Sequence, residues 1–344
     1  MKKVIILLVV LLSASFLLAE VNFYGSLRTG WWYTSQNEDY TGSKARFDFS
    51  NNFYSDSRVG MDYLKDGFTA KVELGLNQSY VTLRHAYGEQ DLGMFEVLVG
   101  RTYSGFSDFA AQGYGPGSDI YLAGYGMLYD GFNTMVKFSL PNGIYFAFMQ
   151  PAKMNFLNLY DYEIDAVIPK INVGMHYEID GIKLHPTFGI AMCNYNKDFS
   201  GTDEGITAYA AAISAEYDMN PLVLKVQFGY GQNIGNYGFK TISYYNGYAM
   251  WDMVNDEIMN ATTTSAYLQA GFGALTIGGG YVMDDIDYLE DPDATMCLFG
   301  QYKLMLGNIC LMPEFGMFDY MEDGMGEKQG AVTYFGTQLR VSIP

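Results

Sequence analysis

The chain has 344 residues, with 38 acidic against 20 basic side chains and a formal net charge of −18. An acidic balance of this size disfavours binding to nucleic acid, whose phosphates attract basic surfaces. Hydrophobic residues make up 49% of the chain and include 30 Tyr and 23 Phe, which is more aromatic surface than a soluble secreted domain usually carries. The three cysteines lie inside strand-like runs and give no evident disulfide framework.

The chain begins MKKVIILLVVLLSASFLLAE, which has the layout of a secretory signal peptide. Two lysines precede an apolar run from Val4 to Leu12, and the small residue Ala19 stands before Glu20. We expect residues 1–19 to be this signal peptide and residues 20–344 to form a single domain. A membrane anchor is the alternative, but the run is short for a spanning helix, and no later segment has about twenty apolar residues in succession.

Beyond residue 20 the main pattern is a two-residue alternation of apolar and polar side chains. In residues 21–33, VNFYGSLRTGWWY, the apolar residues share one face while Ser26 and Arg28 fall on the other. Similar runs flank Asp66-Gly67 and Asp180-Gly181, two dipeptides that favour hairpin turns. Because successive side chains of a strand point to opposite faces, the pattern predicts strands with one apolar and one polar environment.

Short and long connections between these runs alternate along the chain. Short turns are expected at Asp66-Gly67, 91–93, 141–143, Asp180-Gly181, 219–221, Gly273 and 307–308. Long polar connections are expected at 34–57, 104–130, 151–168, 195–205, 235–261, 285–293 and 320–328. One exception is the tight connection Asn77-Gln78-Ser79. The spacing predicts about sixteen strands.

Strands with one apolar face, joined by short turns at one end and long loops at the other, are typical of an outer-membrane β-barrel. Lipid offers no hydrogen-bond partner, so only a closed sheet can cross it with strands. The abundant aromatic residues, with Trp31 and Trp32 near a strand end, suit the two interfacial girdles. The predicted fold is therefore an all-β transmembrane antiparallel barrel. A secreted β-sandwich or propeller is the alternative, and it would not need the regular alternation of loop lengths.

Three segments resemble the general Gram-negative outer-membrane porins. SYVTLRHAYGEQDLGMFEVLVGRTYSGFSDF resembles the hairpin of the family's strands four and five, which ends in a Gly-Arg pair, here Gly100-Arg101. VNFYGSLRTG resembles the first mature strand, and DGFNTMVKFSLPNGIYFAFMQP resembles the hairpin of strands six and seven. The resemblance implies a barrel in the cell outer membrane, surrounded by lipid and lipopolysaccharide. It also implies a water-filled channel for small hydrophilic solutes and ions.

The resemblance also gives a role to residues 104–130, the long loop. In porins the third loop folds into the barrel and narrows the channel, and we expect the same here. Six glycines in the stretch permit unusual backbone angles, while Pro116 stiffens its tip. An outward, disordered surface loop is the alternative.

Basic residues gather on the polar face of the first four strands. Side chains from adjacent strands can form one basic patch, and acidic residues of the long loop could face it across the pore. Arg101 joins the patch only if a bulge or a rim position turns it inward. The alternative is that the arginines only balance Asp62, Glu73 and Glu96 on the same wall. The candidate lumen residues are Arg28, Arg58, Lys71, Arg84, Arg101, Asp108 and Asp119.

Much of the negative charge lies in the long loops, notably in residues 284–293. Such a run is typical of a solvated loop, with collection of divalent cations as the alternative. An acidic vestibule favours cations, so the sequence predicts cation preference.

Catalysis is not expected. His85 falls on the apolar, lipid-facing parity of its strand, and His176 and His185 fall on the lumen parity of one hairpin. No nucleophile elbow, His-Glu-x-x-His helix or paired Cys-x-x-Cys occurs in the sequence, and no cofactor or metal is implied. The competing functions are a substrate-specific channel, with a sugar track formed by tyrosines such as Tyr103 and Tyr125, and a structural barrel without a general pore.

Two features depart from the porin pattern. General porins end in an aromatic residue, whereas this chain ends LRVSIP. The tight connection at Asn77-Gln78-Ser79 replaces the second loop, which latches neighbouring subunits in the trimeric family. A homotrimer is therefore an assembly to be tested.

Overall fold

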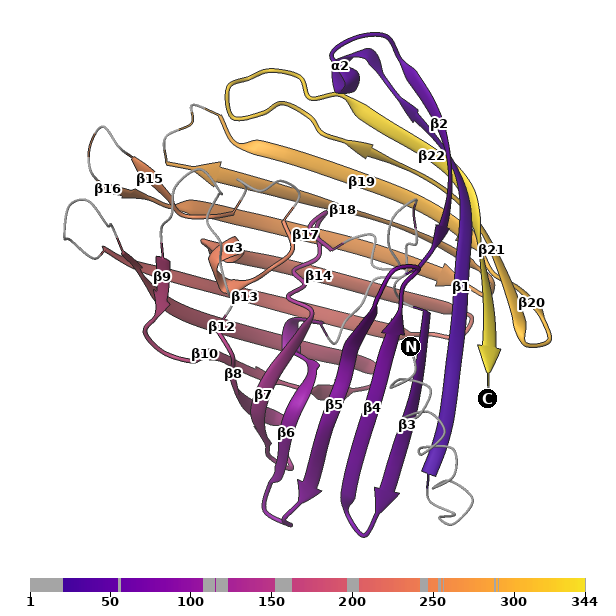
Figure 1. Cartoon of the computed structure of the whole chain (residues 1–344), viewed down its shortest axis with the longest axis vertical. Coiled ribbons are helices and arrows are strands. Elements are labelled where there is room, and N and C mark those ends of the chain that lie inside the picture. The colour runs from indigo at the N-terminus through magenta and orange to yellow at the C-terminus, as the bar shows by residue number, and fades with distance from the viewer. Residues whose placement is uncertain are drawn as a thin grey trace.

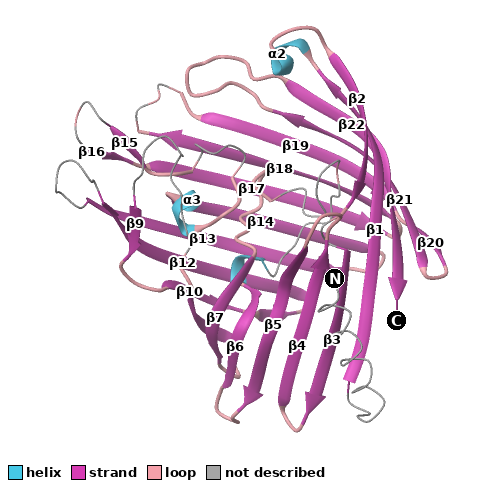
Figure 2. Cartoon of the chain, in the orientation of Figure 1, coloured by secondary structure: helices cyan, strands magenta, loops and turns pink. Residues whose placement is uncertain are grey.

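The structure is a computed structural model and describes residues 21–54, 57–107, 115, 123–151, 163–196, 204–241, 247–252, 255, 257–287, 289 and 291–343. Strands make up most of these residues (Figure 2). The helical segments are α2 (Glu38–Thr41), α3 (Ile234–Tyr237) and the 3-10 turn Gly105–Ser107. Within these ranges, no helix has the length and apolar character needed to cross a membrane.

The strands follow one another around an antiparallel sheet (Figure 1). Their bounds are β1 (Val21–Gln36), β2 (Arg46–Phe53), β3 (Ser57–Lys65), β4 (Phe68–Leu76), β5 (Val81–Asp91), β6 (Glu96–Tyr103), β7 (Phe132–Ser139), β8 (Ile144–Met149), β9 (Glu163–Ala166), β10 (Lys170–Met175), β11 (Tyr177–Ile179), β12 (Ile182–Asn196), β13 (Glu204–Asp218), β14 (Leu222–Gln232), β17 (Ala261–Phe272), β18 (Leu275–Ile286), β19 (Asp293–Tyr302), β20 (Leu304–Leu306), β21 (Ile309–Asp319) and β22 (Ala331–Ile343). The hairpin of β15 (Met250–Asp252) and β16 (Glu257–Met259) forms a separate small sheet.

The sheet closes on itself because the last strand pairs with the first. β22 runs antiparallel to β1 from Gly25↔Ile343 to Gln36↔Val332. Three of the spanning strands consist of consecutive pieces, namely β2 with β3, β9 with β10 and β11, and β19 with β20. Counted in this way, the described residues form a closed barrel of 16 antiparallel strands, which confirms the fold prediction.

The short turns lie at the end of the barrel where β1 begins and β22 ends. Asp66 and Gly67 have φ of 49° and 77°, and Asp180 and Gly181 repeat this geometry, as hairpin turns of this type require. The expected connection 34–57 is wrong in its bounds, because β1 continues to Gln36 and β2 occupies Arg46–Phe53. Its polar residues alternate with Phe47, Phe49 and Phe53, which are all exposed.

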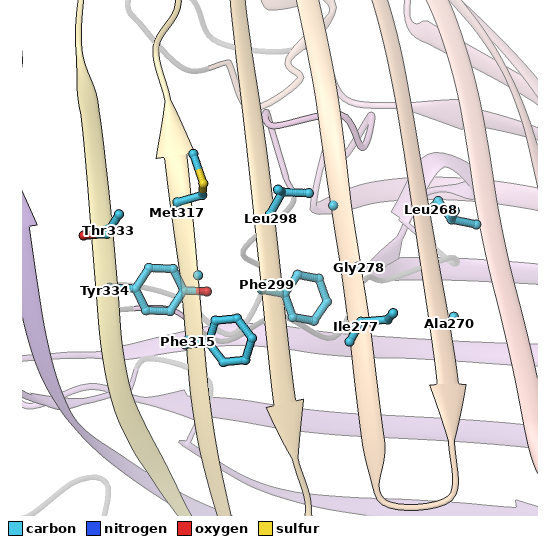
Figure 3. A pocket seen from close by; sticks show the side chains of 12 residues that line it. Leu268, Ala270, Ile277, Gly278, Leu298, Phe299, Phe315, Met317, Thr333 and Tyr334 are labelled. Atoms are coloured by element: carbon cyan, nitrogen blue, oxygen red, sulfur yellow. The ribbon is translucent and has the colours of Figure 1, made fainter.

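The two faces of the sheet differ as a membrane barrel requires. Exposed aromatic side chains such as Phe315 and Phe335 point outward, whereas Glu314 and Gln338 beside them are buried toward the inside. On the outer wall of β17–β22, Leu268, Ile277, Leu298 and Phe315 are among the residues that line an apolar depression of about 690 Å³ (Figure 3). The polar residues therefore gather inside the barrel, where a candidate site must lie.

Candidate functional site: the inner wall of the barrel

One buried carboxylate organises the inner wall of β1, β3, β4 and β5. Glu73, 3% exposed, accepts a hydrogen bond from Arg84 Nε at 2.7 Å and another from Tyr24 Oη at 2.8 Å. Arg58 Nη1 lies 3.7 Å from the same carboxylate. A buried charge needs such partners, because leaving it unpaired in a dry environment is costly. The wall therefore depends on Glu73 for its local charge balance.

A polar cavity of about 620 Å³ opens beside Glu73. Arg28 is 7% exposed, and its Nε donates to Ser26 Oγ at 3.2 Å. Lys71 Nζ lies 3.5 Å from an Asp62 carboxylate oxygen and 5.0 Å from the centroid of the Tyr24 ring. The structure thus brings Arg28, Arg58, Lys71 and Arg84 together around Glu73 on one wall.

Arg340 completes this wall, although the pattern of the first four strands did not include it. It lies directly opposite Arg28 in the pairing of β22 with β1 and lines the same cavity. Two like charges directly opposite each other destabilise a sheet unless other groups compensate. The alternation in β22 places Arg340 on the same face as the buried Tyr334 and Gln338, but only closure of the barrel brings it beside Arg28.

His85 faces inward, so its predicted lipid-facing position is wrong. The pairing of β4 with β5 shifts register between Glu73 and Leu74. Such a bulge reverses the faces of the residues beyond it. His85 is 7% exposed, with Nδ1 2.9 Å from Thr102 Oγ1 and Nε2 4.0 Å from Glu73 Oε1.

The remaining candidate residues do not join the wall. Arg101 pairs with the exposed Thr134, and its Nε donates to the carbonyl of Leu83 at 3.0 Å. Leu83 is itself exposed, so Arg101 lies on the outer side of the sheet. Asp108 and Asp119 lie outside the described residues.

The described parts of the long loop contact inward-facing residues far around the barrel. The Gly115 amide donates to Glu314 Oε1 at 2.9 Å, and its carbonyl accepts from Tyr54 Oη at 3.0 Å. Glu314 also accepts from Tyr334 Oη at 2.8 Å. These partners belong to β21, β22 and the β2–β3 junction, whereas the loop leaves the sheet at β6.

A second set of contacts lies nearer the end of the loop. The Leu128 amide donates to Gln227 Oε1 at 2.8 Å. Tyr125 packs its ring 4.4 Å from that of Phe318 and pairs its hydroxyl with Tyr320 at 3.2 Å. Burial raises the pKa of Tyr125 above its ordinary value, so its hydroxyl remains neutral in this contact.

The model of the family described as Gram-negative porin matches residues 6–300. The chain belongs to the Gram-negative porin family. It is thus an outer-membrane channel protein, in keeping with the apolar outer and polar inner faces of the barrel. No curated protein sequence matches the chain.

Solved porin structures share the fold at low sequence identity. The outer membrane channel DcaP of Acinetobacter baumannii superposes with a TM-score of 0.67 and 14% identity over 94% of this chain and 97% of that one. OmpF of Salmonella typhi gives 0.57 and 13% identity over 93% and 97%. The anion-selective porin from Comamonas acidovorans gives 0.56 and 14% identity over 94% and 99%. At these identities the likeness establishes the fold alone.

The base of the long loop in this porin is fixed by a buried ion pair. Lys170 Nζ on β10 lies 3.1 Å from Asp130 Oδ2, and the two side chains are 2% and 0% exposed. Asp130 also accepts hydrogen bonds from the hydroxyls of Ser104 and Ser107. The carboxylate thereby joins both ends of the loop, because Ser104 begins it and Asp130 ends it.

The porin also carries a histidine pair on the inner wall. The rings of His176 and His185 stack with centroids 4.1 Å apart, and Tyr145 Oη lies 3.0 Å from His185 Nε2. Thr187 Oγ1 lies 3.1 Å from the same nitrogen. Across the ranges that the structure describes, no group of three or more His, Cys, Asp or Glu residues is placed to hold a metal ion.

Proposed function

We propose that this porin forms a water-filled channel for passive diffusion of small hydrophilic solutes and ions, with a preference for cations. The observation that carries the proposal is the opposite character of the two faces of a closed sheet. The outer face is apolar and the inner face is polar. Phe315 is 64% exposed on the outside, while the neighbouring Glu314 is 1% exposed on the inside. A barrel of this size leaves an aqueous lumen unless a segment of the chain obstructs it.

We further propose that the long loop, residues 104–130, narrows this lumen. Its Gly115 backbone is held by Glu314 and Tyr54, and its Leu128 amide is held by Gln227. These partners stand on different parts of the wall, which supports a path across the interior. On this proposal Arg28, Arg58, Lys71 and Arg84 line one side of the constriction, with Asp108 and Asp119 of the loop facing them.

Cation preference follows from the net charge of −18 and from acidic loops such as residues 284–293. The basic wall around Glu73 opposes it locally, so ion selectivity depends on which charges the permeating ion meets. The fold alone does not decide the sign, since the Comamonas acidovorans relative is anion-selective.

The proposal is tested by refolding the mature chain in detergent and inserting it into planar bilayers under a KCl gradient. We expect discrete conductance steps and a reversal potential of the cation-selective sign. A reversal potential of the opposite sign would refute cation preference, but it would not contradict the proposal that the protein forms a channel.

Liposome swelling with neutral solutes of increasing size separates the competing functions. A smooth fall of the swelling rate with size is expected for a general porin. One strongly preferred, saturable solute would instead identify a substrate-specific channel. Complete absence of swelling would identify a structural barrel.

Two further elements belong to the proposal. We infer that residues 1–19 direct export and are then removed, which mass spectrometry of the membrane-extracted protein would test. We also propose a homotrimer, supported by the trimer form of the Vibrio cholerae OmpT relative, at 16% identity and a TM-score of 0.58. Conductance steps that come in threes are the expected signature, whereas single steps would indicate monomers.

A further inference from the structure

The first part of a second loop, residues 233–241, lies against the inside of the barrel. The sixth loop, residues 233–260, connects β14 to β17 and carries α3. All four residues of α3 are buried, and Tyr237 has no exposed surface. Figure 1 shows α3 against the strands of the wall, and its contacts are with β12, β13 and β17. A loop on the rim of a barrel would normally be exposed to water.

Small inward-facing residues make room for this loop. On β13 the inward positions include Ala208, Ala210 and Ala212, which are all buried. A Cβ atom at Gly189 of β12 would lie 2.4 Å from Tyr237 Oη, and one at Gly231 of β14 would lie 2.6 Å from Ile234 Cγ2. Larger side chains at these positions would fill the space that α3 now occupies. The inner wall of β12–β14 is therefore a socket for a loop.

The socket holds the base of the long loop as well. The ring of Phe106 packs 4.8 Å from that of Phe239 and 5.8 Å from that of Tyr237. The Lys240 amide donates to the carbonyl of Tyr129 at 3.0 Å. The sixth loop thus touches the long loop at both of its ends.

Tyr237 also contacts the ion pair that joins those two ends. Lys170 Nζ lies 4.5 Å from the centroid of the Tyr237 ring, and Tyr237 Oη donates to the carbonyl of Ile171 at 3.3 Å. Such a contact stabilises a desolvated ammonium group. Burial raises the pKa of Tyr237 well above its ordinary value, so it acts as a neutral donor.

We propose that residues 233–241 of the sixth loop form a second constriction element, which occupies the lumen beside β12–β14 and holds the long loop in place. This inference rests on the proposed channel function and extends it. Tyr237 and Phe239 are its positioning residues, and they set the upper size of the solutes that pass. The free lumen is then displaced toward the charged wall of β1 and β3–β5.

The main variant removes the loop without disturbing the sheet. Asn233 and Asn260 lie side by side, with Asn233 Nδ2 2.8 Å from Asn260 Oδ1 and the Asn233 amide 2.7 Å from the Ala261 carbonyl. Residues 234–259 can therefore be replaced by two glycines as a tight connection. The second variant, Tyr237→Ala with Phe239→Ala, keeps the loop length and removes only the contacts.

Two matched controls separate this effect from general loop loss. Replacement of residues 42–45 by two glycines shortens the connection between β1 and β2 at exposed positions. Tyr80→Ala removes an aromatic side chain that is 58% exposed in another connection. We expect single-channel conductance to rise roughly 1.5- to 2-fold, with faster swelling for larger solutes, in both sixth-loop variants and in neither control. Unchanged conductance in both sixth-loop variants would overturn the inference.

Chymotrypsin cleavage provides a readout that does not depend on conductance. Phe106 and Tyr129 are 1% and 8% exposed, and the sixth loop covers both ends of the segment that contains them. We expect cleavage at these residues to become about tenfold faster in the excision variant, because local opening governs proteolysis. Equal cleavage rates would refute the docking. If the parent protein does not conduct, but the excision still makes cleavage of the long loop faster, the channel proposal is refuted. The docking of the sixth loop against the long loop is then still supported.

Discussion

Two regions of the inner wall share the two-residue alternation of inward and outward side chains, but their inward side chains differ in size and charge. On β1 and β3–β5 the inward side chains are long and charged, and they surround a polar cavity beside Glu73. On β12–β14 the inward positions beneath the loops include Gly189, Ala208, Ala210, Ala212, Gly229 and Gly231, which lie against Phe106, Leu128 and Ile234. An inward-facing position in a strand therefore does not by itself mean contact with water. Side-chain size distinguishes a wall that faces a channel from a wall that receives another part of the chain.

The largest expected effect comes from the ion pair between Lys170 of β10 and Asp130 at the base of the long loop. Lys170→Met would leave Asp130 buried and without its cation, at a cost of about 3–5 kcal/mol in the free energy of unfolding. Urea titration of the protein in detergent micelles would measure this loss. The control is Lys183→Met, which breaks a 3.0 Å pair with Glu216 by a side chain that is 57% exposed. The control should leave the midpoint unchanged, and equal shifts would contradict the difference between the two pairs.

A smaller effect is expected where the backbone of the long loop approaches Gly280 of the wall. A Cβ at Gly280 of β18 would lie 1.9 Å from the carbonyl oxygen of Tyr125, so Gly280→Val must displace the loop. We expect a loss of about 1–3 kcal/mol in the same titration, together with a changed conductance. At Gly271 of β17 the nearest atom would lie at 3.8 Å, so Gly271→Val is the control. A similar loss at both glycines would show that the close approach is not responsible.

The smallest effect concerns the charged wall. Arg340→Gln removes one of the two guanidinium groups that oppose each other across β1 and β22. The reversal potential should shift by a few millivolts toward stronger cation preference, with an unfolding midpoint equal to or above that of the parent. Arg46→Gln, at an exposed site 3.3 Å from the exposed Asp48, is the matched control and should leave the potential unchanged. A shift toward anions in Arg340→Gln would contradict an inward-facing role.

Local patterns were sufficient to predict the strands and turns. The alternation around Asp66-Gly67 and Asp180-Gly181 depends on neighbouring residues only, and both hairpins are confirmed. The expected connection 34–57 was too long. The polar residues Arg46, Asp48 and Ser50 suggested a loop, although they stand among three outward-facing phenylalanines of a strand. Polar composition was a poorer guide there than periodicity.

The missed features all depend on pairing between distant segments. The inward turn of His85 results from a register shift between β4 and β5, which neither strand reveals by itself. Arg340 lies beside Arg28 only because the barrel closes. The docking of the sixth loop involves a helix of four residues, too short to show a helical period. One signal was present in the sequence, since Ala208, Ala210 and Ala212 occupy the inward positions of β13 where polar side chains would be expected.

The pairing of Gly25 with Ile343 has a practical consequence for engineering. Since the two ends of the sheet adjoin each other, a short linker between them and a cut at Asp66-Gly67 would give a rearranged chain with every strand neighbour preserved. Affinity tags inserted before Val21 or after Ile343 would emerge at the same rim. A label at Met325, 80% exposed in the connection from β21 to β22, would emerge at the opposite rim and report the orientation of inserted molecules.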